Sequence, residues 1–331
     1  MNEQQARDGN KSDERSGQIS SGAAATSWVE IIRLRTLPAA VAPVILGAGA
    51  AQVLGAASGP RVLLAAGVAL ALQIGSNLAN DYSDGVRGTD DERIGPPRLT
   101  ASGQVEPRRV KHAAFGCFAV AGVLGFVLVA LSGHWWLLGA GAAAVAAAWF
   151  YTGGSHPYGY AGLGEVFVFI FFGLMATCGT VYVQVGSVPG WVWIAASGIG
   201  LIACSLLMVN NLRDIATDPL HGKLTLAVRL GERGARRAFT AMITAPVALA
   251  IVAIWWARAG SATAAVGGLP WVRLGAVLAL VVVLAAMAAR TLRPVMAGAT
   301  GRALIPALRD AGLYELTYGS ALAAAFVLVA R

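Results

Sequence analysis

Charged residues and cysteines are scarce in this sequence of 331 residues, and both shortages exclude classes of protein. Only 13% of the residues are charged and 56% are hydrophobic, with a mean hydropathy of +0.64. A soluble domain carries roughly a quarter of its residues as charges, so the composition indicates a polytopic membrane protein. The net charge of +8 predicts contact with anionic lipid headgroups. It predicts no binding of nucleic acid, because no soluble basic domain is evident.

The cysteines and the N-terminal segment carry no further signal. Cys117, Cys178 and Cys204 lie in apolar segments at unrelated spacings, which is typical of packing residues and not of disulfide or metal sites. Residues 1–26 are polar and lack the apolar core of a signal peptide. We therefore expect a disordered cytoplasmic tail over 1–26, followed by a transmembrane domain over 27–331.

Long apolar runs predict an all-α fold with roughly nine transmembrane helices. The expected helices are 37–55, 61–80, 112–132, 134–152, 163–186, 190–210, 239–257, 274–290 and 312–330. With the N-terminus in the cytoplasm, 21 of the 25 Lys and Arg residues would lie on the cytoplasmic side. This asymmetry obeys the positive-inside rule and predicts a multi-pass protein of the cell membrane.

Two polar segments rich in amides and acids end long apolar runs, one over 77–84 and one over 210–218. In the first, Asn77, Asn80, Asp81 and Asp84 are spaced i, i+3, i+4 and i+7. In the second, Asn210, Asp214 and Asp218 are spaced i, i+4 and i+8. Each set is expected to line one face of its helix. Both segments are expected on the cytoplasmic side.

Carboxylates at a membrane boundary are costly unless they bind something positive, and two opposed acidic faces would hold Mg²⁺. Magnesium bound in this way usually holds a phosphate as well. The predicted metal ligands are Asn77, Asn80, Asp81, Asp84, Asp214 and Asp218. The basic residues that follow the acids, and would bind a diphosphate, are Arg87, Arg93, Arg98, Lys223 and Arg229. A membrane location implies that the remainder of the substrate is apolar, which favours transfer of a polyprenyl group from its diphosphate.

These segments, together with the stretch Arg33 to Pro43 and the stretch Gly222 to Ala227, resemble the UbiA superfamily of intramembrane prenyltransferases. The resemblance extends over roughly residues 28–330. It is nearest to the branch that prenylates 1,4-dihydroxy-2-naphthoate in menaquinone synthesis, with loss of CO₂ and diphosphate. The resemblance implies Mg²⁺ as cofactor and a polyprenyl diphosphate as substrate.

The resemblance also predicts roles for single residues of the first segment, through the superfamily pattern Asn-x-x-x-Asp-x-x-x-Asp. Asn80 and Asp84 match its first two places, whereas Gly88 stands in the third, so that Asp90 is the expected substitute ligand. The resemblance implies catalytic roles for Asp84 and Asp214. It implies contact of Lys223 with the diphosphate, and Asn210 and Asn211 are expected to bind substrate as well.

A loop over 151–160 contains three tyrosines. Tyr151 and Tyr160 are candidates to stabilise a developing carbocation through their π faces, and ring deprotonation would fall to a tyrosine or to a carboxylate of the acid-rich segments. An interfacial aromatic belt explains these tyrosines equally well. Glu165 is interpreted as a charge that complements a helix start. Asp310 and Glu315 are expected to pair with Arg309 or loop neighbours.

Other functions compete with this reading. Acidic residues near basic ones often form only solvated ion pairs, which contribute little to stability and need no functional role. A secondary transporter would use acids as ion sites near the middle of the bilayer, and a magnesium-dependent phosphatidyl-group transferase would use a single acidic segment. Within the superfamily, the acceptor ring could be a hydroxybenzoate, homogentisate or haem.

Overall fold

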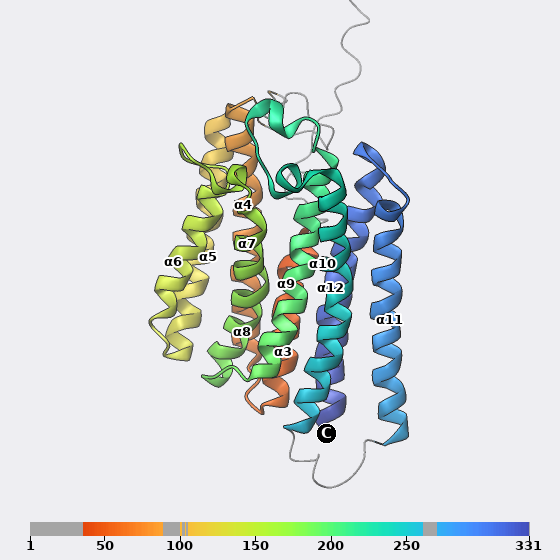
Figure 1. The fold of residues 1–331 in the computed structure, drawn as a ribbon. Helices are drawn as coiled ribbons and strands as arrows, with labels where there is room; N and C mark the ends of the chain where they lie inside the picture. The colour runs from red at the N-terminus through yellow and green to blue at the C-terminus, as the bar shows by residue number, and fades with distance from the viewer. Residues whose placement is uncertain (1–35, 89–99, 101–102, 104, 261–269, 331) are drawn as a thin grey trace, which may run out of the picture.

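The computed structural model describes residues 36–88, 100, 103, 105–260 and 270–330, and over these residues every regular element is helical. Its long helices run antiparallel in one bundle (Figure 1). The elements of the bundle are α3 (Leu37–Val53), α4 (Gly59–Val86), α5 (Pro107–Ser132), α6 (Leu137–Phe150), α7 (Gly164–Val168), the π-helical η3 (Phe169–Met175), α8 (Ala176–Val185), α9 (Gly190–Arg213), α10 (Leu226–Ala259), α11 (Trp271–Met296) and α12 (Ile305–Ala330), and the short segments α7, η3 and α8 follow one another without a break. Short 3₁₀ turns are η2 (Tyr158–Ala161), η4 (Asp218–His221) and η6 (Gly301–Leu304). The predicted tail over 1–26 lies outside the described residues.

Helices form in all nine predicted runs, but the count of nine spans is not confirmed. Within the described part of the chain, seven helices are long and apolar enough to cross a membrane. The other two, α3 and α6, have 17 and 14 residues. At about 1.5 Å per residue they are shorter than the roughly 30 Å hydrocarbon core of a bilayer. The chain is a multi-pass membrane protein.

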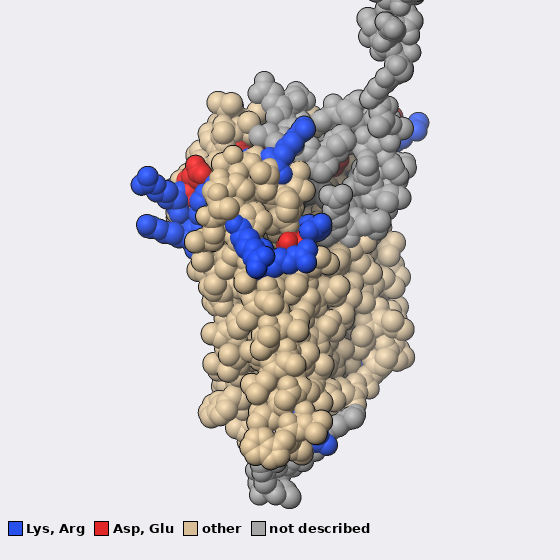
Figure 2. Space-filling model, turned by 90° about the vertical axis from the view of Figure 1, so that its right-hand side faces the viewer, with Lys and Arg blue, Asp and Glu red and all other residues tan. Residues whose placement is uncertain are grey.

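The helices α4 and α9 end at the same end of the bundle, which confirms that the two acid-rich segments share a side (Figure 1). We call this the polar end; it comprises the ends of α4 and α9 and the connections 151–163 and 214–225. Lys and Arg residues gather there (Figure 2). Of those described, only Arg61, Arg258 and Arg273 lie at the opposite end.

Small residues let the central helix α9 approach its neighbours closely. A Cβ atom added to Gly173 in η3 would lie 2.4 Å from the Cα atom of Gly200 in α9, so a larger residue would separate the two backbones. Helix packing inside membranes commonly depends on such small residues. The segment η3 is π-helical and carries the aromatic residues Phe169, Phe171 and Phe172.

Candidate functional site

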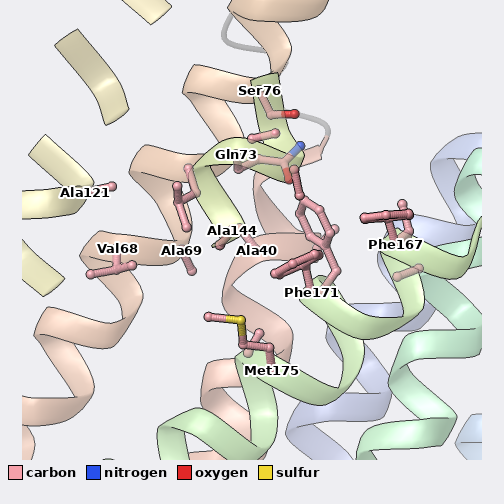
Figure 3. A pocket seen from close by; sticks show the side chains of 18 of the residues that line it. Ala40, Val68, Ala69, Gln73, Ser76, Ala121, Ala144, Phe167, Phe171 and Met175 are labelled. Atoms are coloured by element: carbon pink, nitrogen blue, oxygen red, sulfur yellow. The ribbon is translucent and has the colours of Figure 1, made fainter. Parts of the chain in front are cut away.

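A cavity of about 880 Å³ lies inside the bundle, and its lining reaches the polar end. Most of its lining is apolar, and Figure 3 shows Phe171 and Met175 projecting from η3 into this part. The lining at the polar end consists of amides, acids and two cations. These residues are Asn77, Asn80, Asp81, Asp84, Asn210, Asn211, Arg213 and Lys223. The cavity is therefore polar at one end and apolar in its interior.

The predicted polar face of α4 is confirmed. Asn77, Asn80, Asp81 and Asp84 are all helical, and all four line the cavity. Asp81 and Asp84 are only 2% and 3% exposed. The Oδ1 atom of Asp81 accepts a hydrogen bond from the backbone N–H of Thr100 at 3.0 Å, which holds the chain after α4 against the site.

The loop over 151–163 covers the end of α4 through two side-chain hydrogen bonds. The hydroxyl of Thr152 donates to Asn80 Oδ1 at 2.8 Å. The hydroxyl of Tyr160 donates to Asp84 Oδ1 at 2.9 Å. A hydrogen bond to a charged acceptor is stronger than one between neutral groups, so Tyr160 and Asp84 form the firmer of the two links.

Arg87, which was predicted to bind substrate, packs against the loop over 151–163 and is not part of the cavity wall. Its guanidinium donates to the backbone carbonyls of Thr152 and Gly154. It also lies 5.4 Å from the centroid of the Tyr160 ring, at cation–π distance. These contacts indicate that Arg87 orders the loop.

The expectation that Asn210, Asp214 and Asp218 share one helix face is wrong. Helix α9 ends at Arg213, and Asp218 begins the separate turn η4. For Asp218 the reason is local, because Pro219 follows it, and a proline disfavours helical geometry in the residue before it and offers no N–H to continue a helix. Asn210 lines the cavity, whereas Asp214 and Asp218 do not.

Asp214 is instead paired with its neighbour Arg213. The guanidinium Nε and Nη2 atoms donate to the two Asp214 oxygens at 2.8 and 2.5 Å, respectively. Arg213 is 4% exposed and lines the cavity. Because a buried cation needs a partner, Asp214 acts on the cavity by holding Arg213 in its wall.

Tyr160 is the point where the two acid-rich segments meet. Besides its bond to Asp84, its ring centroid lies 5.7 Å from Lys223 Nζ. Lys223 Nζ is in turn 3.8 Å from Asp218 Oδ1, and the backbone N–H of Lys223 donates to the Asp218 carbonyl at 3.0 Å. The acids of the first segment and of the second are thus linked through one phenol and one ammonium group.

Glycine ends each acid-rich segment. Gly88 and Gly222 have φ values of +73° and +71°, a region that costs other residues about 1–2 kcal/mol. Gly88 therefore terminates the helix and does not extend the polar face of α4. Gly222 turns the chain so that Lys223 points back to Asp218.

Tyr151 lies in the cavity wall directly after α6. Burial, and then the nearby carboxyl groups of Glu165, Asp84 and Asp218, raise the pKa of Tyr151 well above its usual value. Its phenol is therefore neutral at physiological pH. The electrostatic effect of both Asp84 and Asp218 on one side chain is a second sign that the two segments converge.

A series of aromatic rings continues from Tyr151 into the apolar part of the cavity. Tyr151 and Tyr158 are in edge contact with centroids 5.5 Å apart, and Tyr158 stacks on Phe167 at 4.0 Å. Phe167 stacks on Phe171 at 6.2 Å. All four residues line the cavity, so Tyr151 and Tyr158 face inward and are not part of a lipid-facing belt.

Several polar residues near the cavity were missed in the sequence. Gln73 lies one turn before Asn77 on the same face of α4, and both side chains donate to Thr36 Oγ1 at 3.2 Å. Extending the α4 spacing backward by four residues would have found Gln73. Glu165 does begin a helix, but its Oε1 atom also accepts a hydrogen bond from Asn211 Nδ2 at 3.4 Å.

The pairing expected for Asp310 is confirmed, and the pairing expected for Glu315 is wrong. Asp310 contacts Arg290 at 3.0 Å and Arg309 at 3.1 Å. Glu315 is fully buried inside α12, and its carboxyl oxygens have no hydrogen-bond partner among the described residues. The sequence distance from Arg309 suggested a pair, but Glu315 lies on the cavity face of α12.

The remaining predicted residues divide into two groups. Arg229 is exposed, lies away from the cavity and donates to the carbonyl of Leu224 at 3.2 Å. Asp90, Arg93 and Arg98 lie outside the described residues.

The candidate metal ligands at the polar end are side-chain oxygens of Asp and Asn, which are the ligands that Mg²⁺ prefers. Over the described ranges, no three His, Cys, Asp or Glu side chains gather as a metal site. Magnesium commonly takes only one or two carboxylates and completes its shell with water and substrate phosphates. The residues fit an ion shared with a phosphate, and not an ion enclosed by protein alone.

Comparisons with known proteins agree with this architecture. The model of the UbiA prenyltransferase family matches residues 40–294. The chain is 46% identical over 299 residues, 90% of its length and 96% of the relative's, to the 1,4-dihydroxy-2-naphthoate octaprenyltransferase of Mycobacterium tuberculosis. It is 44% identical over 301 residues, 91% and 96% of the two lengths, to the protein of the same name from Mycobacterium leprae.

A solved structure shares the fold. It is a UbiA homolog from Archaeoglobus fulgidus bound to GPP and Mg²⁺, with a TM-score of 0.60 and 14% identity. The match covers 90% of this chain and 100% of that one.

Proposed function

Because the chain belongs to the UbiA prenyltransferase family, we propose that it transfers a polyprenyl chain from its diphosphate to 1,4-dihydroxy-2-naphthoate. The reaction releases diphosphate and CO₂ and yields demethylmenaquinol for menaquinone biosynthesis. The names of the mycobacterial relatives support this acceptor. The observation that carries the proposal is the meeting of both acid-rich segments around Tyr160, which contacts Asp84 and Lys223 in the polar part of the cavity lining.

The diphosphate binds at the polar end, where Arg213 and Lys223 supply positive charge. Asp84, which lines the cavity, is the principal ligand for Mg²⁺ from the first segment, and Asp218, which lies outside the lining beside Lys223, is the ligand expected from the second. The other ligands come from Asn77, Asn80, Asp81 and Asn210. When bound, the ion supplies the charge neutralisation that makes diphosphate a good leaving group. Magnesium bound to the Archaeoglobus homolog supports Mg²⁺ as the cofactor.

The prenyl chain occupies the apolar part of the cavity. Its walls exclude water, which would otherwise react with an allylic cation. The rings of Tyr151, Tyr158, Phe167 and Phe171 line the path from the polar end inward, and their π faces stabilise positive charge on the prenyl carbon.

The polar end faces the cytoplasm, and the protein lies in the cell membrane with residues 27–331 as its catalytic domain. The concentration of Lys and Arg at that end supports this orientation (Figure 2). Proteolysis in sealed vesicles tests it. The connection after α4 should be cleaved in inside-out vesicles and protected in right-side-out ones, and the opposite result would reverse the topology.

The decisive assay supplies purified protein with a polyprenyl diphosphate, Mg²⁺ and one ring acid at a time, followed by mass analysis of the lipid product. We expect product with 1,4-dihydroxy-2-naphthoate, and none after chelation until Mg²⁺ is restored. A product only with hydroxybenzoate or homogentisate would assign a different acceptor. Absence of any prenylated product, together with uptake of a solute into vesicles, would support a transporter.

A variant pair localises the activity. Asp84→Asn removes the charge that Tyr160 contacts and should abolish turnover while leaving a folded membrane protein. Asp310→Asn is the matched control, because it neutralises a buried acid of α12 that does not line the cavity. Near-normal turnover of Asp84→Asn would contradict the metal assignment.

A further inference from the structure

Glu315 is a buried carboxyl group in the wall of the cavity, away from the acid-rich segments. It is 0% exposed and lies among the lining residues. Leu308, two helical turns earlier on α12, also lines the cavity. This face of α12 therefore forms part of the wall, and Glu315 lies about 10 Å deeper than Leu308 along the helix.

The groups around Glu315 leave its carboxyl oxygens without a hydrogen-bond partner among the described residues. Cys204 on α9 is near enough to interact electrostatically with both Glu315 and Glu165. Its thiol donates, however, to the backbone carbonyl of Glu165 at 3.1 Å. The Glu165 carboxylate accepts from Asn211, and Asp310 is paired with two arginines. Of these three buried acids, Glu315 is the one that lines the cavity and whose carboxyl oxygens have no hydrogen-bond partner among the described residues.

Burying an unpaired carboxyl group inside a membrane costs free energy, and a ligand that brings hydrogen-bond donors offsets this cost. A polyprenyl diphosphate with ionised phosphates has no donor. A dihydroxylated aromatic acid has two, its hydroxyl groups. We propose that Glu315 binds a ring hydroxyl of the aromatic acceptor and thereby orients the ring beside the prenyl chain; this rests on the proposed function.

The test removes the carboxylate from the protein and the hydroxyl from the ligand, separately and together. Binding of 1,4-dihydroxy-2-naphthoate, 1-hydroxy-2-naphthoate and 4-hydroxy-2-naphthoate is measured by calorimetry for the wild type, Glu315→Leu and Glu315→Gln. We expect the wild type to bind one of the monohydroxy analogues at least about tenfold more weakly. Glu315→Leu should bind that analogue and the dihydroxy acid equally, and Glu315→Gln should fall between them.

Two further measurements separate contact with the ring from a structural role. The KM for the ring acid should rise in Glu315→Leu while the KM for the polyprenyl diphosphate stays the same. Asp310→Asn, the control on the same helix, should change neither. A merely structural Glu315 would affect both substrates alike and would leave the discrimination between analogues intact.

The outcomes distinguish the two proposals. If Glu315→Leu discriminates between the ring acids as the wild type does, Glu315 does not bind the hydroxyl. Should Glu315→Leu not fold, the same comparison with Glu315→Gln decides the question. If the wild type discriminates between the ring acids as expected and Glu315→Leu does not, but no prenylated product forms, the proposed function fails and the role of Glu315 stands.

Discussion

Replacing Tyr160 by phenylalanine tests the contact on which the two acid-rich segments converge. The change removes the hydroxyl that donates to Asp84 at 2.9 Å. It keeps the ring that lies against Arg87 and Lys223. The variant therefore isolates one hydrogen bond to a carboxylate that is 3% exposed.

The magnitude follows from the charge of the acceptor. A hydrogen bond to a charged group contributes about 1.5–3 kcal/mol, and roughly 1.4 kcal/mol corresponds to a factor of ten. If turnover depends on the orientation of Asp84 by Tyr160, the Tyr160→Phe variant should have a kcat/KM about ten- to 150-fold lower than the wild type. Because the ring remains, the loop over 151–163 should stay in place.

The assay is steady-state transfer at varied Mg²⁺ concentration. The Tyr160→Phe variant should need more Mg²⁺ for half-maximal rate, since Asp84 loses the group that orients it. Tyr182→Phe is the control: Tyr182 lies in α8 and contacts Trp136 at 3.4 Å, at the opposite end of the bundle. A kcat/KM within twofold of the wild type for Tyr160→Phe, with an unchanged Mg²⁺ requirement, would refute the reasoning.

Three further predictions concern the turn, the cavity and the loop. Gly222→Ala places an L-residue at φ +71° at a cost of about 1–2 kcal/mol. It should raise the KM for the polyprenyl diphosphate by displacing the next residue, Lys223; unchanged kinetics would argue against that lysine. Ala69→Phe fills part of the apolar cavity (Figure 3) and should shorten the longest prenyl chain accepted from a mixture, as read by mass spectrometry. Burial raises the pKa of Tyr158 above the ordinary 10.0, so the phenol ionises first in the unfolded chain. Its contribution to stability is complete below pH 10 and is lost as the pH rises from there. Thermal unfolding between pH 9 and 11 should show a shallower loss for Tyr158→Phe, and equal slopes would contradict this.

The α4 face was predictable because its geometry is local. Once an apolar run identifies a helix, the spacing of Asn77, Asn80, Asp81 and Asp84 places all four on one side, and the structure confirms this. The same reasoning failed for Asp214 and Asp218, although Pro219 was visible in the sequence. Helical spacing was extended up to the residue directly before a proline, where helical geometry is disfavoured.

The sequence by itself determined the membrane class, the helical fold and the sharing of one end by both acid-rich segments, because hydropathy, charge placement and helical periodicity act along the chain. Only the tertiary structure decided which of the polar residues meet. Tyr160 contacts both Asp84 and Lys223, and Asp214 forms an ion pair with Arg213. Glu315 lines the cavity from a helix far away in sequence. These contacts depend on how separate helices and loops pack against one another, and no spacing within one segment encodes that.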